Sequence, residues 1–426
     1  MEKSKKDSVI QTKTSDEGLG IEVETRSDYT FKYNTLIGRH GWLRLTPAYS
    51  VKLVRELIMK DCKENAAILD PFSGTATTGL VAAEMGFNAT LFDVNPFLIW
   101  LGNTKCHHFS VEKLSDLQKE FQRCIHDIVI SDNNWIPPIH NIERWWHKET
   151  IKILASIRET LVTVFQEPDG NPYHNLVWIA FSRLIIETSS AAFNHVSMSF
   201  KNQSVQYELT HIITLLEVIF NHIIRSAKTQ LKGKAEIRHG DSRDLSSGKK
   251  ELYDTVITSP PYPNRISYIR ELRPYMYWIK FLQSGNDAGV LDREAIGGTW
   301  GTATSNLKKW NPVNSDLPCS LYEVCDKIKS SGDKNSDIMA RYVHKYFDDM
   351  HSHLKNTCKL LNINANINYI VGNSSFYGLF VDTEKNIAES MSKIGYNNII
   401  INTIRKRNSK KGLFEFNVKA KWPQKK

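Results

Sequence analysis

The segment AILDPFSGTATTGLVAAEMG, residues 67–86, decides the fold. Its first residues are apolar and lead to Asp70, so they predict a buried strand, and TGLVAAEMG predicts a helix that Gly86 ends. Between them, Gly74 allows a tight turn of the backbone. The next segment, ATLFDVN at residues 89–95, predicts a second strand. Strand, turn, helix and strand in this order indicate an α/β sheet with parallel strands.

Acidic residues stand where these strands end. Asp93 follows Gly74 by nineteen residues, where a carboxylate can accept hydrogen bonds from ribose hydroxyls. A dinucleotide site would have several glycines to admit a pyrophosphate, whereas here Asp70 precedes the loop and would pair with an ammonium. S-adenosylmethionine, which carries a ribose, a sulfonium and an ammonium, fits this pattern better. Asp241 ends a later strand and could accept a hydrogen bond from an adenine amino group.

A second stretch, TSPPYPNRISYIREL at residues 258–272, follows a strand-like run. Proline cannot donate to a strand ladder, so Pro260 and Pro261 end the strand abruptly and leave a stiff turn at its carboxyl edge. Ligands bind at that edge in open α/β sheets. Taken alone, two prolines favour a rigid loop that only closes a strand, so the interpretation depends on the rest of the chain.

Together, DPFSGTATT and TSPPY resemble the amino-group DNA methyltransferases, which methylate adenine N6 or cytosine N4. GRHGWLRLTPAYSVKLV resembles an additional cofactor-binding segment of that family, and Ala76 stands where the family more often has glycine. The resemblance implies a Rossmann-like S-adenosylmethionine-dependent methyltransferase fold that acts on duplex DNA. The cofactor-binding residues that it implies are Thr46, Pro47, Asp70, Pro71, Phe72, Ser73, Gly74, Thr75, Ala76, Thr77, Asp93 and Asp241.

The catalytic residues implied by the same resemblance are Ser259, Pro260, Pro261 and Tyr262. The Ser259 side chain and the Pro260 carbonyl would accept hydrogen bonds from the target amino group, and Tyr262 would stack on a base flipped out of the duplex. This chemistry needs no metal. Serine at the first position points to cytosine N4, with adenine N6 as the rival. An RNA guanine-N2 methyltransferase and an inactive DNA-binding subunit are further alternatives.

Other residues near these motifs have weaker signals. Cys319 follows a proline but no strand, so we interpret it as incidental to catalysis. Asn373 and Ser374 end a strand and could form a wall of the base pocket. A last group follows the prolines and could contact phosphates or simply solvate a helix face: Asn264, Arg265, Tyr268, Arg270 and Arg273.

The whole chain divides into four expected parts. Residues 1–29 form a flexible arm, and residues 30–105 carry the first part of the methyltransferase domain, with a helix that starts near Thr46 and Pro47. Apolar residues at spacings of three and four predict a helical insertion over 106–231. Its Trp145, Trp146 and Trp178 are predicted core residues. Residues 232–426 complete the sheet with an antiparallel hairpin, and an irregular loop over 283–335 could take part in target recognition.

Composition limits the class of protein. Of the 426 residues, 41% are hydrophobic and 24% charged, which is ordinary for a globular protein with a core. With no apolar run of membrane-spanning length and no signal sequence, we expect a cytoplasmic protein. A cognate restriction endonuclease is a possible partner. The net charge of +9 gathers after Ile404, where Glu415 is the single acid, and this basic end suits either a phosphate backbone or a solubilising tail.

Overall fold

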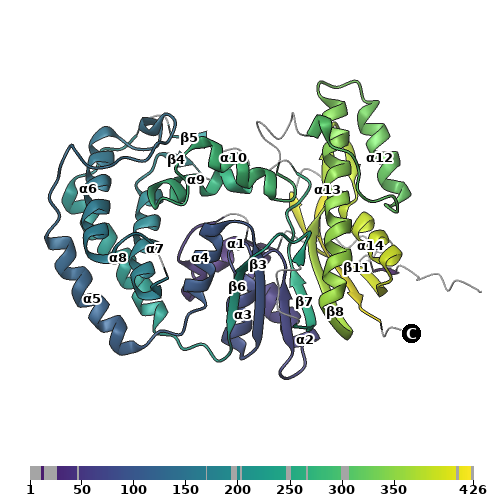
Figure 1. Ribbon diagram of the computed structural model, residues 1–426, viewed down its shortest axis with the longest axis horizontal. Coiled ribbons are helices and arrows are strands. Elements are labelled where there is room, and N and C mark those ends of the chain that lie inside the picture. Colours follow the sequence, from purple (N-terminus) through teal and green to yellow (C-terminus); the bar gives the residue numbers. More distant parts are fainter. Residues whose placement is uncertain are drawn as a thin grey trace, which may run out of the picture.

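The computed structural model describes residues 11–13, 26–45, 48–168, 170–192, 199–201, 204–245, 251–264, 267–298, 307–408 and 412–423. Within these residues an eight-stranded sheet forms the centre of the molecule (Figure 1). Its strands in spatial order are β1 (Gln11–Lys13), β11 (Asn397–Asn408), β12 (Leu413–Lys421), β8 (Leu361–Gly372), β7 (Tyr253–Thr258), β2 (Ala67–Asp70), β3 (Asn88–Asp93) and β6 (Ala235–His239).

The sheet is mostly parallel, which confirms the predicted fold class. Strands β8, β7, β2, β3 and β6 run parallel, and β12 is antiparallel to both β8 and β11. In the sheet, β2 is followed along the chain by its neighbour β3, whereas β7 is followed by β8, which lies in the opposite direction across the sheet. The neighbours β2 and β7 therefore form the point at which the crossover direction changes, and such a point opens a crevice at the carboxyl ends of the strands.

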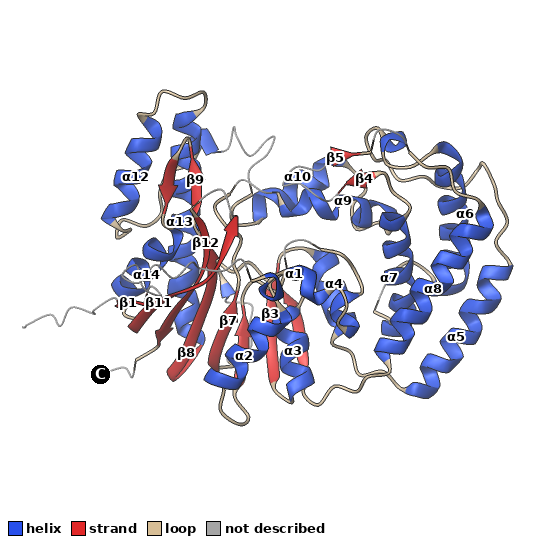
Figure 2. Cartoon of the chain, turned by 180° about the vertical axis from the view of Figure 1, so that it is seen from behind, coloured by secondary structure: helices blue, strands red, loops and turns tan. Residues whose placement is uncertain are grey.

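Helices cover both faces of the sheet. Ile68 of β2 packs with α2 (Val51–Asp61) and α3 (Thr77–Met85), whereas Leu69 packs with α13 (Ser336–Thr357) and α14 (Thr383–Ile394). Successive strand residues point to opposite faces, so a four-residue strand reaches both cores. Figure 2 shows α2 and α3 in front of the strands when the molecule is seen from behind.

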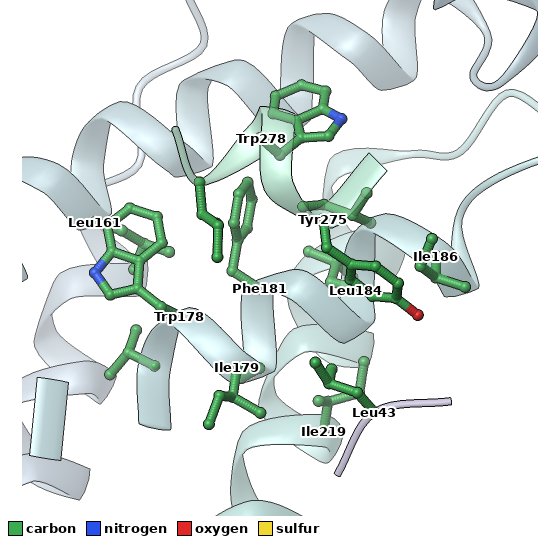
Figure 3. Close-up of a cluster of buried hydrophobic side chains, with 14 of the residues drawn as sticks. Leu43, Leu161, Trp178, Ile179, Phe181, Leu184, Ile186, Ile219, Tyr275 and Trp278 are labelled. Atoms are coloured by element: carbon green, nitrogen blue, oxygen red, sulfur yellow. The ribbon is translucent and has the colours of Figure 1, made fainter. Parts of the chain in front are cut away.

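A block of helices packs beside the sheet within residues 106–231. It contains α5 (Val111–His126), α6 (Lys148–Phe165), α7 (Pro172–Glu187) and α8 (Leu209–Ala227). Trp145, Trp146 and Trp178 are buried in its core, as predicted. This core also takes in α4 (Pro96–Lys105) and, from beyond the insertion, Tyr275 and Trp278 of α9 (Tyr268–Trp278) (Figure 3). The insertion is therefore joined through α9 to the segment that follows the prolines.

The remaining elements are short or lie at the edges. They are α1 (Phe31–Asn34), α10 (Gly285–Glu294), α12 (Cys319–Lys329), the pair β4 (Ala191–Ala192) with β5 (Ser199–Phe200), and the pair β9 (Ser374–Phe376) with β10 (Leu379–Val381). No helix in the described ranges has the length and the apolar composition that crossing a bilayer would require.

The structure differs in detail from three expectations about the chain's organisation: where the helix after Pro47 begins, how regular residues 283–335 are, and how the end of residues 1–29 packs. The helix near Thr46 and Pro47 begins instead at Val51, because the Ser50 side chain caps it by accepting from the Lys52 amide. The segment 283–335 is not wholly irregular, since it contains α10 and α12. A capping box between Ser284 and Asp287 starts α10 despite its two glycines.

The expected arm at residues 1–29 is also partly ordered. Residues 11–13 form β1, which pairs with β11. Tyr29 is buried and donates a hydrogen bond to Glu56, and its ring lies 3.7 Å from the guanidinium carbon of Arg26. The end of the arm is thus packed against α2.

Candidate active site

One cavity of about 330 Å³ lies at the carboxyl ends of β2 and β7. It is lined both by the loop after β2 and by the proline loop after β7, so the two motifs meet although 185 residues separate Gly74 from Ser259. The predicted site residues that line it are Pro71, Phe72, Gly74, Asp93, Asp241, Ser259, Pro260, Pro261 and Tyr262. Thr46 and Pro47 lie outside the described residues.

Asp93 occupies the cavity wall at the end of β3. Its Oδ2 accepts from the Gly74 amide and its Oδ1 from the Asn95 amide, both at 2.9 Å. Burial raises the pKa of Asp93 to about 7, although these two hydrogen bonds oppose the shift. Each carboxylate oxygen keeps a further lone pair. Asp93 can therefore accept hydrogen bonds from two hydroxyls of a ligand in the cavity.

Asp70 lies behind the cavity rather than on its wall. The carboxylate is fully buried, and its Oδ1 accepts from the Phe72 amide at 3.0 Å and from the Thr258 hydroxyl at 2.5 Å. Its Oδ2 has no hydrogen-bond partner among the described residues. Burial raises the pKa of Asp70 to about 6. This carboxylate ties the loop after β2 to the end of β7 and leaves one buried acceptor atom unused.

The rest of the predicted loop supports the cavity from behind. Ser73, Thr75, Ala76 and Thr77 are buried and do not line the cavity. Ala76 precedes α3 with φ of 59°, a left-handed conformation that favours glycine. A glycine would adopt this conformation without strain, so Ala76 carries a small conformational cost at this position.

Asp241 reaches the cavity, but its carboxylate already has a partner. Both of its oxygens accept hydrogen bonds from the Arg243 guanidinium, at 2.6 to 3.0 Å. Burial would raise the pKa of Asp241, yet the hydrogen bonds and charge of Arg243 outweigh it and hold the pKa below its ordinary value. Asp241 is thus an ionised acceptor on the cavity wall, oriented by a neighbouring cation.

The proline loop is held by hydrogen bonds on three sides. The Ser259 hydroxyl donates to the Ile370 carbonyl at 3.2 Å, and the Pro261 carbonyl accepts from the Tyr346 hydroxyl at 2.8 Å. The Tyr262 amide donates to the Tyr268 hydroxyl at 3.2 Å. The loop is therefore held in a defined position by hydrogen bonds to its neighbours.

The Tyr262 ring is oriented by residues that the sequence did not identify. Its hydroxyl donates to Oε1 of Glu415 at 2.8 Å, and Glu415 in turn pairs with Arg405 at 2.8 Å. The guanidinium carbon of Arg407 lies 5.1 Å from the ring centroid. Burial and the nearby Glu415 carboxylate raise the pKa of Tyr262 well above its ordinary value, so the hydroxyl stays protonated. The signal for Glu415 was its position as the single acid in a basic segment.

Other expectations near the site have mixed outcomes. Asn373 and Ser374 are buried and do not line the cavity, because the Asn373 side chain bonds the backbone of Gly412 and Phe414 instead. Cys319 begins α12 and is exposed, away from the cavity. Tyr29 and Tyr49 do line the cavity, and nothing in their local sequence indicated it.

Known proteins share parts of this chain. A family model described as "DNA methylase" matches residues 25–102. The type II methyltransferase M.AvaI, recorded from Nostoc sp. and Anabaena variabilis, is 22% identical over 410 residues, covering 88% of this chain and 82% of that protein.

Two further relatives show lower coverage. The type II methyltransferase M.BsoBI of Geobacillus stearothermophilus is 24% identical over 58% of this chain and 54% of its own length. The type II methyltransferase M.MvaI of Kocuria varians is 20% identical over 79% of this chain and 77% of its own length. This chain is thus similar to DNA methylases over residues 25–102 and to type II methyltransferases over most of its length.

Proposed function

We propose that this protein transfers a methyl group from S-adenosylmethionine to cytosine N4 in duplex DNA, as the modification enzyme of a restriction system. The observation that carries the proposal is the single cavity shared by Gly74 and Asp93 on one side and by Ser259 and Tyr262 on the other. A methyl donor and a target base must meet in one enclosed space, since transfer needs the reacting atoms within about 3.5 Å. Its volume, about 330 Å³, lies within the range of small-molecule sites.

The residues present fit S-adenosylmethionine. Asp93 would accept from the ribose hydroxyls, because its carboxylate faces the cavity with lone pairs to spare. Asp70 does not line the cavity, so it would hold the loop after β2 in position for the cofactor rather than contact the ammonium itself. The cofactor supplies an electrophilic methyl group on a sulfonium.

The chain's own residues would then activate the amino group of the target base. That nitrogen is a poor nucleophile because its lone pair is delocalised into the ring. Hydrogen bonds from its two protons to the Ser259 side chain and the Pro260 carbonyl would favour a pyramidal nitrogen with an available lone pair. These acceptors are held in place before the base arrives, which lowers the barrier by preorganisation. Serine rather than an acid at the first position supports cytosine over adenine.

Tyr262 is expected to hold the base by stacking. Tyr262→Ala should weaken methyl transfer about 10- to 100-fold, since base–aromatic stacking contributes roughly 1–3 kcal/mol. Tyr262→Phe keeps the ring but loses the hydrogen bond to Glu415, so it should have a smaller effect. Steady-state methylation with varied DNA concentration measures both variants. Tyr322→Ala, at an exposed tyrosine on α12, is the matched control and should behave like the wild type. Equal rates for the Ala variant and the wild type would remove the stacking role.

The reaction product tests the proposed specificity. DNA incubated with the protein and labelled S-adenosylmethionine should, after digestion to nucleosides, yield labelled N4-methyl-2′-deoxycytidine identified by mass spectrometry. N6-methyladenine as the sole product would keep the methyltransferase and reject the cytosine assignment. Label in tRNA but not in duplex DNA would reject a DNA substrate altogether.

A further inference from the structure

A groove of about 560 Å³ lies on the surface between part of the helical insertion and α9. The insertion contributes His140, Arg144, Trp145 and Phe200, and the α9 side contributes Arg270, Arg273, Pro274 and Tyr277. None of the described residues that line the groove is an aspartate or glutamate. Three arginines beside three aromatic rings give a surface suited to an anionic ligand with flat apolar parts.

Two of these arginines are available to a ligand. Arg144 and Arg270 are exposed, and neither pairs with a carboxylate in the described part of the chain. The guanidinium carbon of Arg144 lies 4.7 Å from the Phe200 ring centroid, which orients its charge without neutralising it. Arg273 differs, because it lies 3.8 Å from Asp292, which accepts a hydrogen bond from the helix cap Ser267. Arg144 and Arg270 therefore define what we call the arginine groove.

The arginine groove and the active-site cavity use opposite faces of α9. Tyr268, Ile269 and Leu272 line the cavity, whereas Arg270 and Arg273 line the groove. A helix with its side chains is about 10–12 Å across, and a DNA strand has a phosphate about every 3.4 Å of axis, so roughly three nucleotides would span α9. In Figures 1 and 2, α9 and α10 lie between the helical block and the sheet, with β4 and β5 beside them.

We propose that the arginine groove binds the sugar–phosphate backbone of the DNA strand next to the target base, with the helical insertion as one wall of the DNA-binding surface. This inference rests on the proposed function. When a base is flipped into the cavity, the nucleotides next to it in the strand lie within about the width of α9 from the cavity. The arginine groove lies on the other side of α9 from the cavity, and its aromatic residues suit the sugars and bases between the phosphates.

The salt dependence of DNA binding tests this role. Each phosphate contact contributes about 0.9 to the slope of log K against log salt, so Arg144→Ala/Arg270→Ala should lower the slope by about 1.8. Affinity for a short fluorescein-labelled duplex of mixed sequence should fall on the order of 50-fold at 0.1 M salt. The affinity for S-adenosylmethionine should stay within about twofold of the wild type. Fluorescence anisotropy between about 50 and 200 mM salt measures the slope.

A charge-matched variant provides the control. Arg123→Ala/Arg225→Ala removes the same charge from exposed positions on α5 and α8, outside both the groove and the cavity, and should leave the slope unchanged. Equal slopes for the two double variants would overturn the groove assignment, even if the wild type methylates DNA. Conversely, the wild-type protein could bind duplex DNA with a salt slope that Arg144→Ala/Arg270→Ala lowers, yet transfer no methyl group. That result would refute the proposed function and support the assignment of the groove to DNA binding.

Discussion

Ser259→Ala should lower the single-turnover rate of methyl transfer to DNA about 100-fold, a loss comparable to removing one preorganised hydrogen-bonding group from an active site. The reason is that the amino group of the base would lose one of its two acceptors, leaving only the Pro260 carbonyl. The Kd for S-adenosylmethionine should change by less than about twofold, because the cofactor side of the cavity is formed by other loops. Rapid-quench mixing measures the rate, and calorimetry measures the Kd.

Ser374→Ala is the matched control for that experiment. Ser374 is a buried serine, its hydroxyl has no hydrogen-bond partner among the described residues, and it does not line the cavity. Its removal should leave the rate unchanged. The Ser259 hydroxyl donates its hydrogen bond to the Ile370 carbonyl, and loss of one such bond costs about 1 kcal/mol, so thermal unfolding should be little affected by the catalytic variant. A rate loss accompanied by an equal loss of cofactor affinity would contradict the assigned role.

Much of the fold and both site loops could be predicted because their signals are local. The turn at Gly74 and the strand end at Pro260 depend on the conformations allowed to a few adjacent residues. Parallel strands bring their carboxyl ends to one edge, so two such loops share a cavity when their strands are neighbours. That β2 and β7 are neighbours followed from the family resemblance. The local sequence pattern alone does not predict which strands pair.

The partners of Tyr262 could not be predicted because they depend on long-range register. Glu415 is 153 residues away in the chain, and it faces Arg405 only because β11 and β12 pair with irregularities between Thr403 and Arg405. A shift of one residue would turn these side chains to the other face of the sheet. Sequence reasoning recognised Glu415 as an isolated acid but had no means of placing it against the tyrosine.

Asp93→Asn is expected to have the largest effect on cofactor binding, raising the Kd for S-adenosylmethionine about 100-fold. In the native site both carboxylate oxygens accept backbone amides, from Gly74 and Asn95, so an asparagine must turn its NH₂ group toward one of these donors. It also offers the ribose a weaker acceptor, since hydrogen bonds to a charged group are worth roughly 1.5–3 kcal/mol. Asp348→Asn is the control, because Asp348 likewise accepts from two backbone amides, those of Val313 and Asn314, but lies outside the cavity. Both variants should lose stability, and only the first should lose the cofactor.

The pH dependence of cofactor binding tests whether the negative charge of Asp93, and not only the size of its side chain, is needed to bind S-adenosylmethionine. Burial raises the pKa of Asp93 to about 7 in the free protein, and the ribose hydroxyls prefer the ionised carboxylate. Protonation therefore competes with binding below that pH, and the Kd should rise up to tenfold for each unit that the pH falls below about 7. Above it the Kd should level off. The Asp93→Asn variant has no proton to lose at this position, so this dependence should disappear from its binding isotherms. A wild-type Kd that is constant from about pH 5 to 8 would mean that the ionised Asp93 does not hold the ribose, and the cofactor would then have to be held by other residues of the cavity.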